Sequence, residues 1–387
     1  MTLFIDATGF GMIIPLLPFY AETFQAGSVA LGVLIASFPL MQFVFSPILG
    51  RLSDSVGRKP VLAVSILTSA ASFVFFAIAN SFLILLLSRI VAGLATETAV
   101  AQAYIADITG EKERASGMGK VGAAHAAGFI IGPAIGGTLS VYGFSVPGLA
   151  AVVLTVINLL FVLVFLPESL PQQDSSRHVV ARSNASFLRR LLDAFSKPLI
   201  GTVLVIFFIV FLSWSAIPVI MPLLGVFFFG FGSVEMSYLF IYMGTIQIMW
   251  QGVLIGRLTE KVGEAQLIAF GPLLLMLGIV LMPLIPNVGI FVFALTIISL
   301  GSGTMRTVVP SFISKISPAN EQGGILGVTN GVASIARVPG PLIAGFLFES
   351  AGSASPFFAS AAMLIVAFGF GLRARAGLWK VKPKTYS

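Results

Sequence analysis

The 387-residue sequence contains no cysteine, and only 10% of its residues are charged. The absence of cysteine excludes disulfide bonds, and a chain with only two histidines, His125 and His178, lacks the paired histidine ligands of a typical zinc site. Charged residues are too few to cover a water-soluble protein of this size, because the mean hydropathy is +1.03. Most of the chain must therefore be surrounded by lipid.

Lysine and arginine are missing from every second gap between the apolar runs of the sequence. These gaps are short and carry only acids, namely Glu22, Glu235 and Glu349. Most of the Lys and Arg residues lie in or beside the alternate gaps, or in the C-terminal tail. Since cytoplasmic loops of membrane proteins hold the excess of Lys and Arg, we expect a multi-pass protein of the cell membrane with both termini in the cytoplasm.

Twelve apolar runs have the length of about 20 residues that a helix needs to cross a hydrocarbon core of roughly 30 Å. They are too long for the strands of a membrane barrel and lack the alternation of such strands. We therefore predict an all-α polytopic membrane protein. The runs cover residues 2–24, 29–50, 60–80, 82–107, 116–141, 146–167, 198–224, 235–257, 265–285, 288–315, 323–349 and 354–374.

One long gap divides six runs from six. We expect an N-terminal six-helix bundle over residues 1–167, a cytoplasmic linker over 168–197, and a C-terminal six-helix bundle with a short basic tail over 198–387. The second half of the linker places its apolar residues on one helical stripe, which predicts an amphipathic helix along the inner leaflet. This stripe consists of Phe187, Leu188, Leu191, Leu192 and Phe195.

The two halves of the sequence are repeats of each other. The segment Gly50–Arg58 recurs as Gly256–Glu264 at an offset of 206, and Ile131–Gly137 recurs as Pro339–Gly345 at an offset of 208. Parallel six-span repeats, related by a pseudo-two-fold axis along the membrane normal, are typical of carriers with alternating access. We expect the two bundles to be related in this way.

The gap after the second run resembles the signature loop of the major facilitator superfamily, and the resemblance covers nearly the whole chain. Glycines allow a tight turn there, and we expect Asp54 to face the N-terminus of the eleventh span near Gly323. This contact would hold the cytoplasmic side closed, with about 0.3 to 2 kcal/mol for a charge at a helix end. A tight turn with surface charges is the alternative, and Ser55 departs from the family in lacking a basic side chain. The matching residues are Gly50, Asp54, Gly57, Arg58 and Lys59.

The fifth run resembles the glycine-rich motif of the exporter and antiporter branch of this family. Three of its glycines, four residues apart, share a face that lets another backbone approach closely. Close packing is one explanation, and a pliable contact between the halves is the other. The first run, Phe4–Pro18, is similar to that of the twelve-span drug/proton antiporters, including the tetracycline exporters. The motif of the fifth run contains Gly128, Gly132, Pro133, Gly136 and Gly137.

Among the ionisable residues inside the runs, six are candidates for a role within the membrane, where a charge costs about 2.5 to 3.5 kcal/mol. At about 1.5 Å per residue, three of them lie about 13 to 17 Å from the cytoplasmic end and thus near the midplane. These three are Glu97, His125 and Arg306. The other three are Asp6, Arg89 and Arg337.

We predict that Glu97 is the principal proton-binding carboxylate and that Arg306 is its countercharge. Asp6 would be a second carboxylate nearer the cytoplasm, and His125 a further proton-coupling candidate. A static buried ion pair is the alternative for Glu97, and a packing histidine is the alternative for His125. Arg89, which with Gly93 resembles the arginine motif of the family, and Arg337 would belong to an intramembrane charge network with a structural or gating role.

Polar side chains that could line a substrate cavity are sparse. Sugar carriers would need more amides and hydroxyls, whereas 35 Phe and 12 Met residues suit amphiphilic or hydrophobic compounds. Packing and lipid contact are the alternative explanation for these residues. The cavity candidates are Gln102, Tyr104, Trp214, Gln247, Trp250, Gln251 and Asn330.

These features predict a proton-coupled exporter of small amphiphilic or hydrophobic organic compounds that works by alternating access, as a monomer in the bilayer. We expect no cofactor, metal or nucleic-acid partner. The alternatives are a proton-coupled importer of sugar or another metabolite, a lipid-moving carrier, and a non-transporting scaffold. An enzyme is disfavoured, because no Ser-His-Asp arrangement or phosphate-binding loop can be assigned.

Overall fold

The computed structural model describes residues 1–387 except 96, 110, 170–186, 285–286, 319–321 and 379–387. In the described part every regular element is a helix, and twelve helical segments are long and apolar enough to cross a membrane. The predicted all-α, twelve-span class is thus confirmed. Predicted and observed ends differ by a few residues, most clearly for the second span, where 29–50 was expected and Ser28–Val56 is observed.

The described chain divides by its contacts into two compact units. The N-unit comprises Met1–Arg182 and Met221–Gly244, and the C-unit comprises Ser183–Ile220 and Thr245–Ser387. The segment Met221–Gly244 packs with the N-unit through contacts such as that between the hydroxyls of Ser140 and Ser233, 2.9 Å apart. The division by repeats, with boundaries at residues 167 and 198, stays a prediction.

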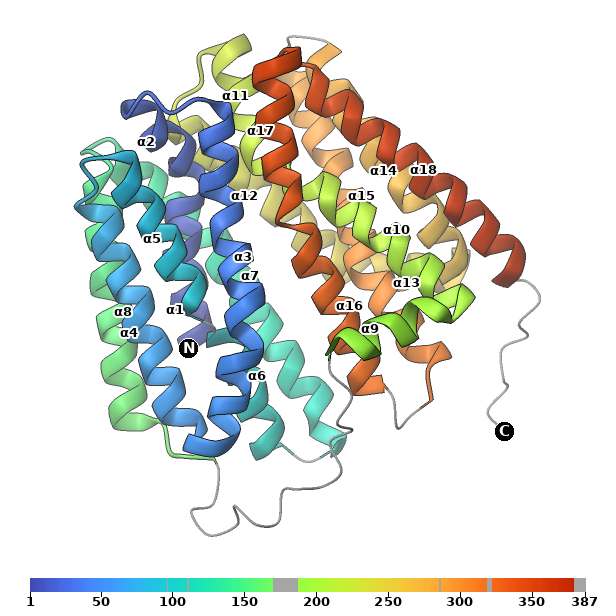
Figure 1. Ribbon diagram of the computed structural model, residues 1–387, viewed down its shortest axis with the longest axis horizontal. Coiled ribbons are helices and arrows are strands. Elements are labelled where there is room, and N and C mark those ends of the chain that lie inside the picture. The colour runs from blue at the N-terminus through green and yellow to red at the C-terminus, as the bar shows by residue number, and fades with distance from the viewer. Residues whose placement is uncertain (96, 110, 170–186, 285–286, 319–321, 379–387) are drawn as a thin grey trace. The chain divides into compact units, whose positions relative to one another are not determined.

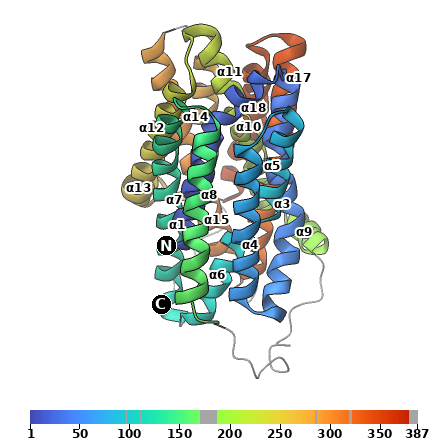
Figure 2. The same ribbon diagram turned by 90° about the vertical axis from the view of Figure 1, so that its left-hand side faces the viewer.

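Helix α1 lies at the centre of the N-unit, between α7 and α8 (Figure 2). The first span is interrupted after α1, because Pro15 and Pro18 cannot donate backbone hydrogen bonds and a short 3₁₀ turn takes over. The helices of this unit are α1 (Thr2–Ile13), η1 (Ile14–Leu16), α2 (Leu17–Thr23), α3 (Ser28–Val56), α4 (Arg58–Ala77), α5 (Phe82–Leu94), α6 (Glu97–Ile108), α7 (Glu111–Ser140) and α8 (Ser145–Phe165), together with most of α11 (Ile217–Phe229) and the first part of α12 (Ser233–Met249).

Helix α14 lies between α15 and α18 in the C-unit, and α10 packs against α15, α16 and α18 (Figure 1). The predicted amphipathic helix of the linker is present as α9, and the linker residues 170–186 lie outside the described part. The remaining elements are α9 (Phe187–Ser196), α10 (Pro198–Ser215), the π-helix η2 (Trp250–Leu254), α13 (Ile255–Val262), α14 (Glu264–Leu284), α15 (Val288–Ile316), α16 (Gln322–Ala336), α17 (Pro339–Ala351) and α18 (Ser355–Leu378).

The turn between α3 and α4 consists of a single residue, Gly57, with a φ of 113°. This conformation strains any residue with a Cβ, which explains the glycine. The expectation that the loop begins at Gly50 is wrong, because Gly50 lies inside α3, seven residues before the turn at Gly57. The corresponding residue of the second repeat, Gly263, also has a positive φ, of 86°.

Candidate functional site

Glu97 is the first residue of α6, at the break that divides the fourth span into α5 and α6. Its side chain is buried, with the whole residue only 4% exposed. The hydroxyl of Ser69, on α4, donates a hydrogen bond of 2.6 Å to Glu97 Oε1. This contact fixes the carboxyl group of Glu97 within the N-unit, and it is stronger when Glu97 is ionised than when it holds a proton.

Asp6 lies on α1, which packs against α6. Its partly buried side chain is within electrostatic range of Glu97. Two carboxylates that repel each other in a low-dielectric interior cannot easily be ionised together, and one proton relieves the repulsion. The structure thus brings together two of the four predicted proton-coupling residues.

His125 lies on α7, where its ring stacks on Phe129 with 5.8 Å between centroids and 23° between planes. Phe129 in turn contacts Phe10 of α1, with centroids 5.9 Å apart. This aromatic surrounding agrees with the packing alternative for His125. A part in proton coupling stays a prediction.

Arg306 lies in the C-unit, near the middle of α15. Its guanidinium carbon is 4.7 Å from the ring centroid of Trp214 and 5.4 Å from that of Phe211, both on α10. Such cation–π contacts contribute about 0.5 to 2 kcal/mol each. Arg337, between α16 and α17, lies close enough to repel Arg306. The pairing of Arg306 with Glu97 would join the two units and stays a prediction.

Polar side chains of α12 and η2 bond to α15 at the positions four and two residues before Arg306. Trp250 Nε1 donates a hydrogen bond of 2.9 Å to Thr304 Oγ1, and Gln247 Nε2 donates one of 3.3 Å to Ser302 Oγ. Gly303 lies between these two acceptors, and a Cβ there would be 3.2 Å from the Trp250 ring. Trp250 also begins the π-helix, a local widening that is frequent at functional sites.

The structure therefore places Trp214 against Arg306, and it places two other predicted residues, Gln247 and Trp250, against Ser302 and Thr304 of the same helix. The sequence analysis did not predict Phe211, Ser302 and Thr304, the side chains that contact Arg306, Gln247 and Trp250 respectively. A signal was present for Ser302, because a residue four positions before Arg306 lies on the same face of a helix.

Three other cavity candidates lie elsewhere. Tyr104 is buried in the N-unit, where its hydroxyl donates to the Pro167 carbonyl oxygen at 3.1 Å. This bond ties the fourth span to the end of the sixth. Gln102 and Asn330 are exposed, whereas Gln251 is partly buried near Gly303. Their contact with a substrate stays a prediction.

The signature residues form a charge cluster at the predicted cytoplasmic end of the N-unit. The buried Arg58 binds Asp54 at 2.7 Å through Nη1 and Asp107 at 2.8 Å through Nε. Arg58 Nη1 also donates to Ser53 Oγ at 2.7 Å. The predicted contact of Asp54 with the eleventh span, which belongs to the C-unit, stays a prediction.

Glu168 caps the N-terminus of α4, a role that was missed in the sequence. Its carboxylate accepts hydrogen bonds from the backbone N–H of Arg58 at 2.9 Å and of Lys59 at 3.0 Å. Lys59 Nζ also donates to the Leu163 carbonyl oxygen at 2.9 Å. A negative charge at a helix N-terminus is stabilising, so Glu168 joins the sixth span to the start of the third.

The second repeat carries the same ion pair with its charges reversed. Glu264 corresponds to Arg58 at an offset of 206, and Lys315 corresponds to Asp107 at an offset of 208. Lys315 Nζ and Glu264 Oε1 are 2.9 Å apart, and Ser311 Oγ donates to the same oxygen at 2.8 Å. An ion pair thus joins the third span to the fourth in the N-unit and the ninth span to the tenth in the C-unit, with the positions of the positive and negative residues exchanged.

The glycine face of α7 packs directly on the backbone of α1. A Cβ at Gly128, Gly132 or Gly136 would lie less than 3.0 Å from backbone atoms of α1. Gly137 points elsewhere, because a Cβ there would be 2.5 Å from the Cβ of Ser237 on α12. Close packing therefore accounts for the three spaced glycines, and a pliable contact between the halves stays a prediction.

Arg89 is almost wholly buried in α5, with 1% of the residue exposed. Its guanidinium carbon lies 5.8 Å from the ring centroid of Phe76, and its Nε donates to Ser88 Oγ at 3.2 Å. Neither Nη atom has a hydrogen-bond partner among the described residues. These contacts place Arg89 inside the N-unit, in keeping with a structural role.

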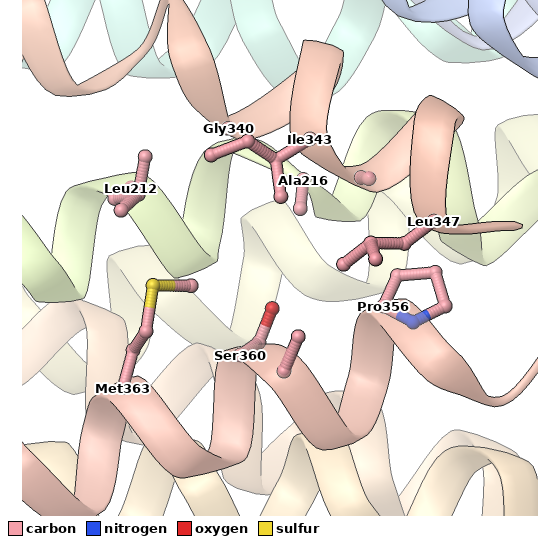
Figure 3. Close-up of a pocket in the computed structure, with 10 residues that line it drawn as sticks. Leu212, Ala216, Gly340, Ile343, Leu347, Pro356, Ser360 and Met363 are labelled. Atoms are coloured by element: carbon pink, nitrogen blue, oxygen red, sulfur yellow. The ribbon is translucent and has the colours of Figure 1, made fainter. Parts of the chain in front are cut away.

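A small pocket lies between α10, α17 and α18 in the C-unit (Figure 3). Its wall is apolar apart from the hydroxyl of Ser360, which is buried. None of the predicted site residues lines it, so we do not assign it a transport function. The wall includes Leu212, Ala216, Gly340, Leu347, Pro356 and Met363.

Comparison with known proteins places this architecture in a family. Residues 1–340 and 251–385 match the profile of the Major Facilitator Superfamily. A tetracycline resistance protein of class G from Vibrio anguillarum is 32% identical over 342 residues, which cover 87% of this chain and 86% of the relative. Multidrug resistance protein 2 of Bacillus subtilis is 27% identical, with 98% and 94% covered.

A solved structure has the same fold. It is a bacterial homologue of the human lysosomal transporter Spinster in an inward-facing, unoccupied conformation, 16% identical, with a TM-score of 0.79 and with 98% of this chain and 96% of that chain covered. Twelve spans, the signature cluster around Arg58 and the match over nearly the whole sequence agree. The chain belongs to the Major Facilitator Superfamily.

Proposed function

We propose that this chain exports small amphiphilic organic compounds in exchange for protons, and that Glu97 carries the proton. The observation that supports this most strongly is the pair of carboxylates, Glu97 and Asp6, inside the N-unit. A buried carboxylate is neutral when it holds a proton and costly when it is ionised without a partner. Glu97 can therefore take up or release its proton on whichever side of the membrane water reaches it.

Export is favoured over import by the relatives. Two of them are resistance proteins, for tetracycline and for multiple drugs, and a transporter gives resistance by lowering the concentration of a drug in the cell. The sparse polar side chains around Arg306 also suit an amphiphilic compound better than a sugar. Both termini would lie in the cytoplasm, where the cluster around Arg58 would join the spans of the N-unit.

Flux measurements in membrane vesicles test this proposal. A panel of compounds that includes tetracycline is first screened for thermal stabilisation of the detergent-purified chain. Compounds that stabilise it are then added to inside-out vesicles whose lumen is acidified. We expect them to accumulate in the lumen as protons leave, and to be released when a protonophore removes the gradient. Movement in the same direction as the protons, or no effect of the gradient, would contradict exchange.

A further inference from the structure

Arg306 brings a positive charge into the membrane interior of the C-unit, and no ion pair with a carboxylate of the described residues balances it. Arg306 and Arg337 lie within electrostatic range of each other. No acidic residue occurs in α10, α15, α16 or α18. The acids on the other helices of this unit lie toward the helix ends, and one of them, Glu264, is bonded to Lys315 and Ser311.

The two repeats differ at the positions where their sites correspond. An offset of 208 aligns Arg306 with Thr98, next to Glu97, and aligns Trp214 with Asp6. The N-unit thus has a pair of carboxylates where the C-unit has an arginine stacked on a tryptophan. Two sites of common origin have acquired opposite charge, so we expect them to bind different chemical groups.

Arg306 is stacked on aromatic rings and has one hydrogen-bond donor, Nε, that no described residue accepts from. The guanidinium carbon lies over the rings of Trp214 and Phe211, and such stacking uses the face of a planar guanidinium and not its N–H groups. Arg306 Nε is buried and has no hydrogen-bond partner among the described residues. A guanidinium held in this way matches a carboxylate, which can accept two parallel hydrogen bonds from it.

Trp214 and Phe211 supply aromatic surface beside Arg306, and a further aromatic side chain, Trp250, packs on the same helix, α15. Trp250 is held by its bond to Thr304, and Gln247 by its bond to Ser302, so both are fixed in position. Gly303 between them adds no side chain to this face of α15. Aromatic side chains beside one charged residue are typical of sites for small organic molecules.

We infer that the C-unit holds a subsite for the acidic group of aromatic substrates, with Arg306 as the residue that binds the anion and Trp214 as the residue that fixes its plane. This inference rests on the proposed function and names a substrate class for it. Compounds with a carboxylate or enolate next to a flat ring are then better ligands than their neutral esters. The carboxylates of the N-unit remain the proton carriers.

Equilibrium dialysis of the purified full-length protein with anthracene-2-carboxylate and its methyl ester tests the inference. We expect the acid to bind roughly 10- to 100-fold more tightly than the ester, as charge-assisted hydrogen bonds imply. Arg306→Gln should abolish this preference. Arg257→Gln, which removes an exposed positive charge from the same unit, should keep it. Equal binding of acid and ester, or an unchanged preference in Arg306→Gln, would overturn the inference.

Arg306→Lys provides a second variant if Arg306→Gln does not fold. Lysine keeps the charge but lacks the planar pair of donors, so we expect the preference for the acid to fall without vanishing. A preference equal to that of the wild type would contradict the role of the guanidinium. Because binding is measured without a gradient, its failure leaves the exchange of substrate for protons untouched, and a failure of flux leaves the subsite untouched.

Discussion

The hydroxyl of Ser69 donates a 2.6 Å hydrogen bond to the carboxylate of Glu97, and so joins α4 to the break in the fourth span. Both residues are buried in the N-unit. The bond explains how an acidic side chain is held inside a membrane protein without an arginine or lysine bonded to it among the described contacts. Coupling to protons requires that this carboxylate stay where water can reach it from only one side at a time.

Ser69→Ala should lower the thermal stability of the protein in detergent. A hydrogen bond contributes about 0.5 to 1.5 kcal/mol between neutral groups and about 1.5 to 3 kcal/mol to a charged group, and the variant leaves Glu97 without its donor. Ser65→Ala is the matched control, since Ser65 is buried on the same helix and its hydroxyl has no partner among the described residues. Equal melting temperatures for both variants would show that the bond does not stabilise the fold.

Gly132→Ala should destabilise the N-unit, because the new methyl group would meet the backbone of α1 at Thr8 and Gly11. Overpacking of this kind typically costs about 1 to 3 kcal/mol. Gly122→Ala on the same helix has open space around the new methyl group and should not lower stability. Thermal unfolding of both variants is the measurement, and a stable Gly132→Ala would contradict the close packing of α7 on α1.

The ion pairs of Arg58 and of Lys315 should contribute differently to the stability of the protein. Arg58 is buried and binds two carboxylates, so Arg58→Met leaves Asp54 and Asp107 without their cation and should cost about 3 to 5 kcal/mol. The Lys315 side chain is 64% exposed, so Lys315→Met should cost no more than about 1 kcal/mol. The free energy of unfolding of the two variants in denaturant checks this order. Equal losses in the two variants would contradict it.

Asp54→Asn should impair transport with little loss of folded protein. Arg58 keeps its bonds to Asp107 and Ser53 in this variant, so the N-unit retains its cluster. The predicted contact of Asp54 with the eleventh span would be lost. Flux in vesicles and the amount of folded protein are measured together, with Ser55→Ala as an exposed control on the same turn of α3. Unchanged flux in Asp54→Asn would exclude the proposed lock.

Local sequence patterns predicted the spans well and the turns less well. The apolar runs are long enough to mark all twelve spans, because lipid requires about 20 apolar residues in each. The extent of α3 was missed, since Gly50, Arg51 and Leu52 fit a loop or an exposed helix end equally well. Only the φ of Gly57 shows where the turn lies.

Partners that are distant in the sequence account for what was missed in the site. Glu168 caps α4 from 110 residues away, and Ser69 reaches Glu97 across two helices. Neither contact occurs at a characteristic sequence spacing, so no sequence motif could predict it. By contrast, the charges of Glu97 and Arg306 stood out in the sequence, because an ionisable residue inside an apolar run is rare and needs a reason.

The count of protons released when a substrate binds tests the role of Glu97 most directly. The compound that stabilises the purified protein most is added in weakly buffered detergent solution, and the pH is followed with an indicator dye. We expect the wild type and Glu22→Gln, an exposed control, to release protons, and Glu97→Gln to bind the compound without releasing any. Release from Glu97→Gln equal to that of the wild type would show that another group carries the proton.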